Sequence, residues 1–155
     1  MSLLHFYRRP ALSETKKNNL LSAARQYVSS DIKEIETEYC FNIETTAPLT
    51  AEELKILNWL LTETFEPENF SSESFLTRHS LIEVGPRMNF TTAWSANAVS
   101  VFHACGLKKI MRIERSRRYK LIGYQLSAIS RQQFLSLVHD RMTECPYQET
   151  LETFE

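Results

Sequence analysis

Residues 84–99, with the sequence VGPRMNFTTAWSANAV, bring guanidinium, amide, hydroxyl and indole groups together between an apolar strand-like segment and a helix-like one. We expect Ser95 to cap the helix that follows, with Trp94 packing on Val99 as a hydrophobic staple. Free N–H groups at a helix N-terminus suit a phosphate or a carboxylate. The polar residues around this N-terminus are Arg87, Asn89, Thr91, Thr92, Ser95 and Asn97. The alternative is a long loop whose polar groups only satisfy its own backbone.

Two arginines further along the chain raise a second question of chemistry. By strict strand alternation, Arg115 and Arg117 share a face with four apolar residues, Met111, Ile113, Tyr119 and Leu121. A guanidinium on an apolar face needs a partner, which is a carboxylate of the protein, a ligand anion, or solvent reached through a β-bulge. The same stretch is basic, with seven Lys and Arg residues and one acid between Lys108 and Lys120.

Composition excludes several classes of function. The three glycines are isolated, so no glycine-rich nucleotide loop is possible, and the three cysteines form no CxxC pair. The formal net charge of -1 argues against a dedicated nucleic-acid binder, and no apolar run is long enough for a membrane span. We therefore expect a cytoplasmic protein with reduced thiols, no metal site and no membrane partner.

The first part of the chain alternates strands and helices. Residues 34–45 alternate between acidic and apolar side chains, which predicts a long strand with one face of each kind. Thr50 and Glu53 form a capping box that opens an amphipathic helix. The other expected elements are a strand over 3–9, a helix from the cap Ser13 to about Val28, and a loose connection over 65–74.

The same order begins again after this connection. Leu3 and Leu81 are separated by 78 residues, as are Ile35 and Ile113. The expected elements are a strand from Leu81, a helix over 96–105 closed by Gly106, a long strand over about 110–124, and a helix over 132–142 with Ser130 and Gln133 as its capping box.

This repetition predicts an α+β fold made of two ferredoxin-like βαβα halves related by internal duplication. The pseudo-repeats cover about 1–65 and 79–143, and packing the two copies together would complete one core. Long strands with one apolar face favour antiparallel sheets covered by helices on one side. The acidic face of the first long strand matches the basic face of the second, so pairing of the two would add roughly 0.2 to 1 kcal/mol for each opposite-charge pair.

Several separated motifs also resemble the N-terminal region of the large, single-chain phosphoribosylformylglycinamidine synthases. They are LLHFYRRPALS, EIETEYCFNI, LIEVGPRMNFTTAWSANAVSVFHACGL, RIERSRRY and VHDRMTE, the last with Val138 where the family has leucine. The resemblance covers nearly the whole chain. It implies a PurS-like domain over 1–145, so called because the region is similar to two copies of a separate small subunit, followed by the start of an interdomain linker over 146–155.

The complete enzyme of that family uses ATP and glutamine to convert formylglycinamide ribonucleotide to formylglycinamidine ribonucleotide in purine biosynthesis. Its ATP and magnesium lie in central synthetase domains and its glutaminase triad in a C-terminal domain. The resemblance therefore implies a non-catalytic assembly domain, inactive alone and without cofactors of its own, whose partners are those domains. It also implies that the loop over 85–97 helps to complete the synthetase active site. The candidate substrate-binding or domain-interface residues are Arg87, Asn89, Thr91, Thr92, Trp94, Ser95, Asn97, Arg115, Arg117 and Arg118.

Two alternatives remain open from the sequence. One is a free-standing ferredoxin-like nucleic-acid binder that uses the basic stretch over 108–120, although Tyr119 and Tyr124 are the only aromatic residues that this long strand offers for stacking. The other is an anion-binding module in which the loop over 85–95 captures a nucleotide unaided. Self-association is possible, because removal of the synthetase partner would uncover an apolar patch on this domain.

Overall fold

The computed structural model describes residues 3–62, 67–77 and 80–154. Within these ranges the chain forms six strands, four α-helices and one short 3-10 helix. Their order is β1 (Leu4–Arg8), α1 (Glu14–Tyr27), β2 (Glu34–Thr45), α2 (Ala51–Thr62), η1 (Pro67–Asn69), β3 (Phe70–Ser71), β4 (Leu81–Pro86), α3 (Ala93–Ala104), β5 (Ile110–Ile122), α4 (Ala128–Val138) and β6 (Glu144–Tyr147).

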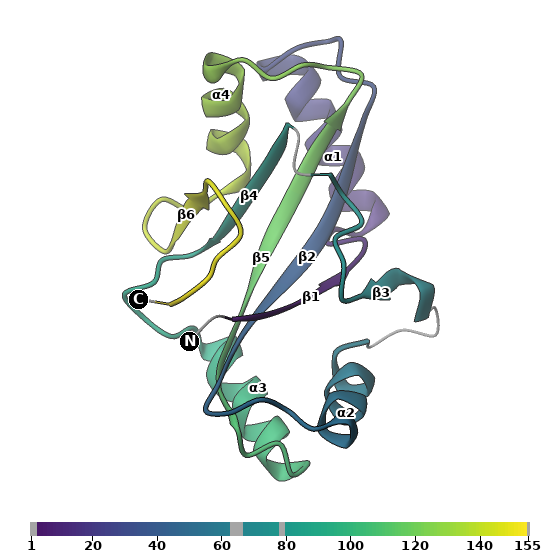
Figure 1. Cartoon of the computed structure of the whole chain (residues 1–155). Helices are drawn as coiled ribbons and strands as arrows, with labels where there is room; N and C mark the ends of the chain where they lie inside the picture. Colours follow the sequence, from purple (N-terminus) through teal and green to yellow (C-terminus); the bar gives the residue numbers. More distant parts are fainter. Residues whose placement is uncertain (1–2, 63–66, 78–79, 155) are drawn as a thin grey trace.

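The strands form one antiparallel sheet in the order β3-β1-β2-β5-β4-β6. The predicted antiparallel α+β class is confirmed. The strands of the two halves lie in a single sheet, because β2 and β5 pair along almost their whole length at its centre (Figure 1). The predicted order of strand, helix, strand and helix occurs twice, as β1-α1-β2-α2 and β4-α3-β5-α4. The expected repeat boundaries at 65 and 79 lie outside the described residues.

The charged faces of the two central strands meet as predicted. The register places acidic residues of β2 directly opposite basic residues of β5, as Glu36 opposite Lys120, Glu38 opposite Arg118 and Glu44 opposite Arg112. Opposite charges in facing positions stabilise this register, since a slip by one residue would exchange the polar and apolar faces.

The hydrophobic core consists of two clusters rather than the single one expected. One joins α2 and α3 to the sheet around Phe41, Ile43 and Ile113, and the other joins α1 and α4 to it around Ile35 and Tyr119. Alternation along β2 and β5 places these residues on the same face of the sheet. Each helix pair combines one helix from each half, and the pairs lie at opposite ends of the long strands (Figure 1).

Two helix caps confirm the sequence analysis. Ser13 accepts a hydrogen bond from the N–H of Lys16 at the start of α1. At the start of α2, Thr50 and Glu53 exchange the two hydrogen bonds of a capping box. Gly106 follows α3 with a φ of 90°, the left-handed conformation expected just after a helix end.

The predicted start of α3 and both predicted ends of α4 are wrong by three to four residues. Thr92, not Ser95, caps α3, and Ser127 caps α4, with Ser130 inside the first turn completing its capping box. Ser95 cannot serve as the cap because its buried hydroxyl accepts the N–H of Ile113 in β5. Trp94 consequently lies in the first turn of α3, where it stacks on Phe41 instead of stapling to Val99.

Two strands were not predicted. β3 is a two-residue strand at one edge of the sheet, and β6 pairs with β4 at the opposite edge. Beyond β6 the chain returns to the sheet, where Phe154 is buried and the N–H of Leu3 donates to the carbonyl of Glu152. The division into a domain over 1–145 and a linker from 146 stays a prediction. Within the described residues no helix has the length and apolar character needed to cross a bilayer.

Candidate functional site

A cavity of about 210 Å³ opens on the helix-bearing face of the sheet. On β5 it lies between Ile113 of one core cluster and Tyr119 of the other. Four predicted site residues meet at this cavity from α3 and β5. The complete lining is Tyr39, Pro86, Thr92, Trp94, Glu114, Arg115, Arg117 and Glu144.

Arg115 lies between two aromatic rings of this lining. The centre of its guanidinium is 4.6 Å from the centroid of Trp94 and 5.0 Å from that of Tyr39. Such contacts use the faces of the rings and hold the side chain over the cavity. Among the described residues, no carboxylate lies within ion-pair distance of Arg115 and no acceptor bonds to it.

Arg117 pairs with a carboxylate of the protein, which is one of the three partners that the sequence allowed. Two of its nitrogens donate to Glu144 in β6 at 2.8 and 3.1 Å, another hydrogen bond reaches the Tyr119 hydroxyl at 2.9 Å, and a fourth reaches the Val138 carbonyl at 2.8 Å. Burial alone would lower the pKa of Arg117, but the bonds to Glu144 and Tyr119 outweigh it and raise that pKa. Arg117 is thus a permanently charged residue that fastens β6 to the sheet.

The N-terminus of α3 already holds a carboxylate of this chain. Glu114 is 1% exposed and accepts the N–H and the hydroxyl of Thr92 at 3.1 and 2.6 Å. It also accepts a hydrogen bond from Nε of Arg112 at 3.1 Å. A negative charge at this point is favoured by the helix dipole. The anion predicted for the helix N-terminus is therefore supplied internally, by a residue that the sequence analysis did not single out.

The remaining loop residues point to solvent. Arg87, Asn89, Thr91 and Asn97 are exposed, and none of them lines the cavity. Arg87 donates two hydrogen bonds to the carbonyl of Arg141, at 2.8 and 3.2 Å. These four residues therefore form a polar surface beside the cavity, whereas Pro86, Thr92 and Trp94 of the same loop are part of its wall.

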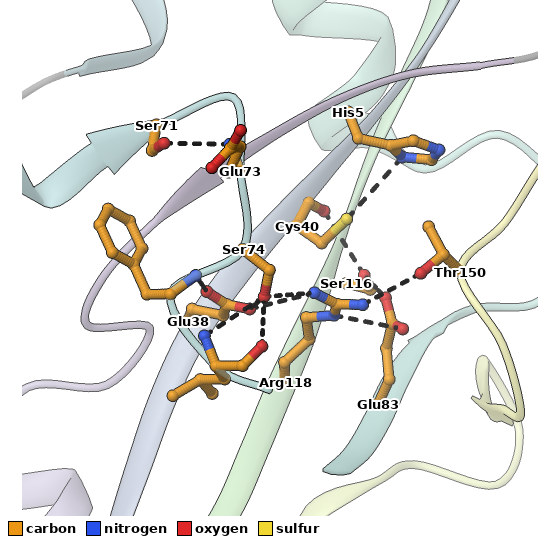
Figure 2. A network of polar contacts seen from close by, with 12 residues as sticks. His5, Glu38, Cys40, Ser71, Glu73, Ser74, Glu83, Ser116, Arg118 and Thr150 are labelled. Carbon is orange, nitrogen blue, oxygen red and sulfur yellow. Dashed lines mark hydrogen bonds and ion pairs between the residues drawn. The ribbon is translucent and has the colours of Figure 1, made fainter. Parts of the chain in front are cut away.

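Arg118 lies on the opposite face of the sheet and belongs to a different network (Figure 2). Its guanidinium contacts Glu38 at 3.0 Å and Glu83 at 3.3 Å, with both carboxylates buried. Ser74 and Thr150 complete the surroundings, one from the segment after β3 and one from the C-terminal segment. This arrangement makes Arg118 a buried structural residue that the structure does not bring to the cavity.

Cys40 and His5 lie next to this network (Figure 2). Burial raises the pKa of the Cys40 thiol to about 12, and burial also lowers the pKa of His5. Both groups are therefore held neutral near pH 7. The described residues contain no cluster of His, Cys, Asp or Glu suited to a metal ion.

Most of the basic stretch is engaged within the protein. Lys109 pairs with Glu53, Arg112 with Glu114, Arg117 with Glu144 and Arg118 with two glutamates. A nucleic-acid surface needs such charges free for phosphates. The pairings leave the nucleic-acid alternative without its expected surface in the described part of this strand.

Together these features define an α+β domain with one antiparallel sheet, an arginine-containing cavity and an exposed polar loop beside it. The chain matches the family model "Formylglycinamide ribonucleotide amidotransferase N-terminal" over residues 38–154. It belongs to that family, as the sequence motifs indicated.

Three similar proteins bear the name phosphoribosylformylglycinamidine synthase. One from Dictyostelium discoideum is 46% identical over 100% of this chain and 12% of its own length. A probable one from Arabidopsis thaliana, named as chloroplastic/mitochondrial, is 45% identical over 99% of this chain and 11% of its length. The third, from Homo sapiens, is 37% identical over 98% of this chain and 12% of its length. The chain thus spans only about an eighth of these relatives.

Proposed function

We propose that this chain is the non-catalytic N-terminal assembly domain of a phosphoribosylformylglycinamidine synthase, the ATP- and glutamine-dependent amidotransferase of purine biosynthesis. The observation that carries the proposal is the match of almost the whole chain to one small part of much longer relatives. ATP, magnesium and the glutaminase residues then belong to other domains of the longer protein. A cytoplasmic location is part of the proposal and is supported by three cysteines that are all unpaired.

The same proposal includes a PurS-like origin by duplication. It is supported by the repeated order of elements and by the two long strands, which pair antiparallel at the centre of the sheet. An antiparallel pairing of two corresponding strands is consistent with a pseudo-twofold axis between the halves.

The loop over 85–97 is the part of the domain that we assign to the synthetase side. Its exposed residues Arg87, Asn89, Thr91 and Asn97 are available to a neighbouring domain or to the ribonucleotide. Thr92, Trp94 and Ser95 anchor the end of the loop to β2 and β5, and Arg117 fixes the neighbouring β6.

A chimera tests the assignment of the domain. The matched segment of the Dictyostelium relative is replaced by this chain, and glutamine-dependent ADP formation is measured with formylglycinamide ribonucleotide as substrate. We expect activity within about tenfold of the parent, because an assembly domain of the same family preserves the interface. A chimera that is folded and full-length, with this chain joined to the rest of the relative, but that is inactive would refute the assignment.

Arg87 tests the loop in the same chimera. We expect Arg87→Ala to lower kcat/KM for the ribonucleotide by about tenfold, the loss of one charged contact. Arg141→Ala is the matched control, since it removes an exposed guanidinium nearby but keeps the carbonyl that Arg87 contacts. If kcat and KM are unchanged by Arg87→Ala, the loop has no substrate role.

A further inference from the structure

The guanidinium of Arg115 is the one cationic group lining the cavity that has no anion beside it among the described residues. It is partly buried against Trp94 and Tyr39. Withdrawing a charge from water is costly unless the charge is paired. Ring contacts with the faces of Trp94 and Tyr39 compensate in part, but they do not use the N–H groups at the edge of the guanidinium. Those N–H groups form a fork whose spacing matches the two oxygens of a carboxylate or phosphate.

Three arginines, Arg112, Arg115 and Arg117, meet two glutamates here, which leaves an excess of one positive charge. The cavity is also lined by Glu114 and Glu144, but each is already paired, with Arg112 at 3.1 Å and with Arg117 at 2.8 Å. Because these two glutamates are fixed by their own partners, neither is free to turn toward Arg115. An external anion would therefore meet a net positive site.

The size of the cavity limits what can enter. About 210 Å³ corresponds to roughly seven water molecules at about 30 Å³ each. Pockets for drug-sized ligands start at about 300 Å³. The cavity is open to solvent, so it takes a single carboxylate or phosphate group with a few waters, and the rest of any larger ligand would lie outside it.

We propose that Arg115 and the cavity between Trp94 and Tyr39 bind one oxyanion group, either the carboxylate of an acidic side chain or a phosphate monoester. Arg115 supplies a two-pronged contact, and the aromatic rings hold the fork in place before the anion arrives. The inference concerns this chain alone and does not depend on its place in a longer enzyme.

Trp94 provides a direct reporter, because its ring contacts Arg115. The chain has one other tryptophan, Trp59, which is 77% exposed, so Trp59→Phe leaves a folded protein with Trp94 as its only indole. In this background we would titrate inorganic phosphate and, separately, acetate at constant ionic strength maintained with chloride. We expect a saturable change in Trp94 emission with a midpoint in the millimolar range for at least one of the two anions.

Three further variants make the test specific. Arg115→Gln removes the charge and the fork, and Arg115→Lys keeps the charge but loses the fork, so we expect binding to weaken by at least about tenfold in the first and by several-fold in the second. Arg9→Gln is the matched control, because Arg9 also stacks on an aromatic ring, that of Phe75, but lies away from the cavity. It should change binding by less than about twofold.

The two probes separate the sources of the anion. Saturation by phosphate alone assigns the site to a phosphate monoester, and saturation by acetate assigns it to an acidic side chain. If neither anion saturates the signal, or if Arg115→Gln binds as well as the parent while its circular dichroism shows a folded chain, the proposal is wrong.

Discussion

Arg118 shows how one buried charge can hold several parts of a fold together. It contacts Glu38 and Glu83 on the face away from the helices, and Ser74 and Thr150 enclose it. Glu38 also accepts the N–H of Phe75, so the same network fixes the segment after β3. The position that the sequence placed on a polar strand face is therefore a structural centre.

We expect Arg118→Met to destabilise the protein by about 3 to 5 kcal/mol, because it leaves two buried carboxylates without their cation. Urea unfolding followed by circular dichroism measures this loss. Arg9→Met is the control, since Arg9 is exposed and its removal should cost less than about 1 kcal/mol. Equal effects of the two substitutions would show that the network contributes nothing special.

Glu144 predicts a pH dependence of stability. Burial would raise the pKa of its carboxyl, but hydrogen bonds from Arg117 and from the N–H of Asp140 hold it below the ordinary value. A pKa lowered in the folded state adds stability above the unfolded pKa of about 4.3, and this stability is lost as the pH falls through the folded pKa.

Glu144→Gln should therefore destabilise the protein at pH 7 by on the order of 1 kcal/mol, after allowance for solvent screening of a partly exposed pair. The difference from the parent should shrink as the pH is lowered below about 4.3. Urea midpoints at pH 7 and pH 3.5 provide the comparison, with Glu149→Gln, an exposed glutamate on the same segment, as the control. A difference that stays constant with pH would contradict the assignment.

The N-terminus of α3 depends on a contact between elements. Thr92 caps the helix and donates its hydroxyl to Glu114 in β5, so one side chain joins the helix to the sheet. We expect Thr92→Ala to cost about 1 to 2 kcal/mol, more than a surface cap because it also removes a donor from a buried carboxylate. Thr91→Ala, at an exposed position one residue earlier, should change stability by less than about 0.5 kcal/mol in the same thermal unfolding experiment. Similar losses in both would indicate that Thr92 is not the cap.

Local patterns were sufficient for the long elements. Strict alternation over 34–45 and the run from Ile110 predicted β2 and β5, and their opposite charges led to the hypothesis that the two strands pair, which the register confirms. The starts of α3 and α4 could not be read locally, because several hydroxyl residues compete as caps at each. At α3 the cap is selected by contacts with β5, which is distant in the sequence. The Thr92 hydroxyl donates to Glu114, and the Ser95 hydroxyl accepts the N–H of Ile113 and so is not the cap.

The cavity was predictable only in part. Alternation identified Arg115 and Arg117 as charged residues on an apolar face, and the unusual composition drew attention to Thr92 and Trp94. The partner of Arg117 comes from β6, a four-residue strand with a proline and no alternating pattern. This strand depends on the edge of β4 and on the pair between Arg117 and Glu144, which are contacts between distant parts of the sequence, so the local pattern predicted neither β6 nor the role of Glu144.

Neither half of the fold can form a core cluster alone, because each cluster needs helices from both halves. Each helix pair takes one helix from each half, and the central pairing of β2 with β5 joins them. The cavity lies on this shared sheet and collects residues from both halves, Tyr39 from one and Arg115 from the other. The site therefore depends on the assembled domain, and a domain of this kind can present the cavity and the loop together to one partner.

Reconstitution tests the assembly role most directly. The purified chain is added to the Dictyostelium relative from which the matched N-terminal segment has been removed, and ADP formation that requires both glutamine and formylglycinamide ribonucleotide is followed. We predict that activity absent from the truncated relative returns and saturates with added chain. A chain that neither binds the truncated relative nor restores its activity would contradict the assignment of this protein as an assembly domain.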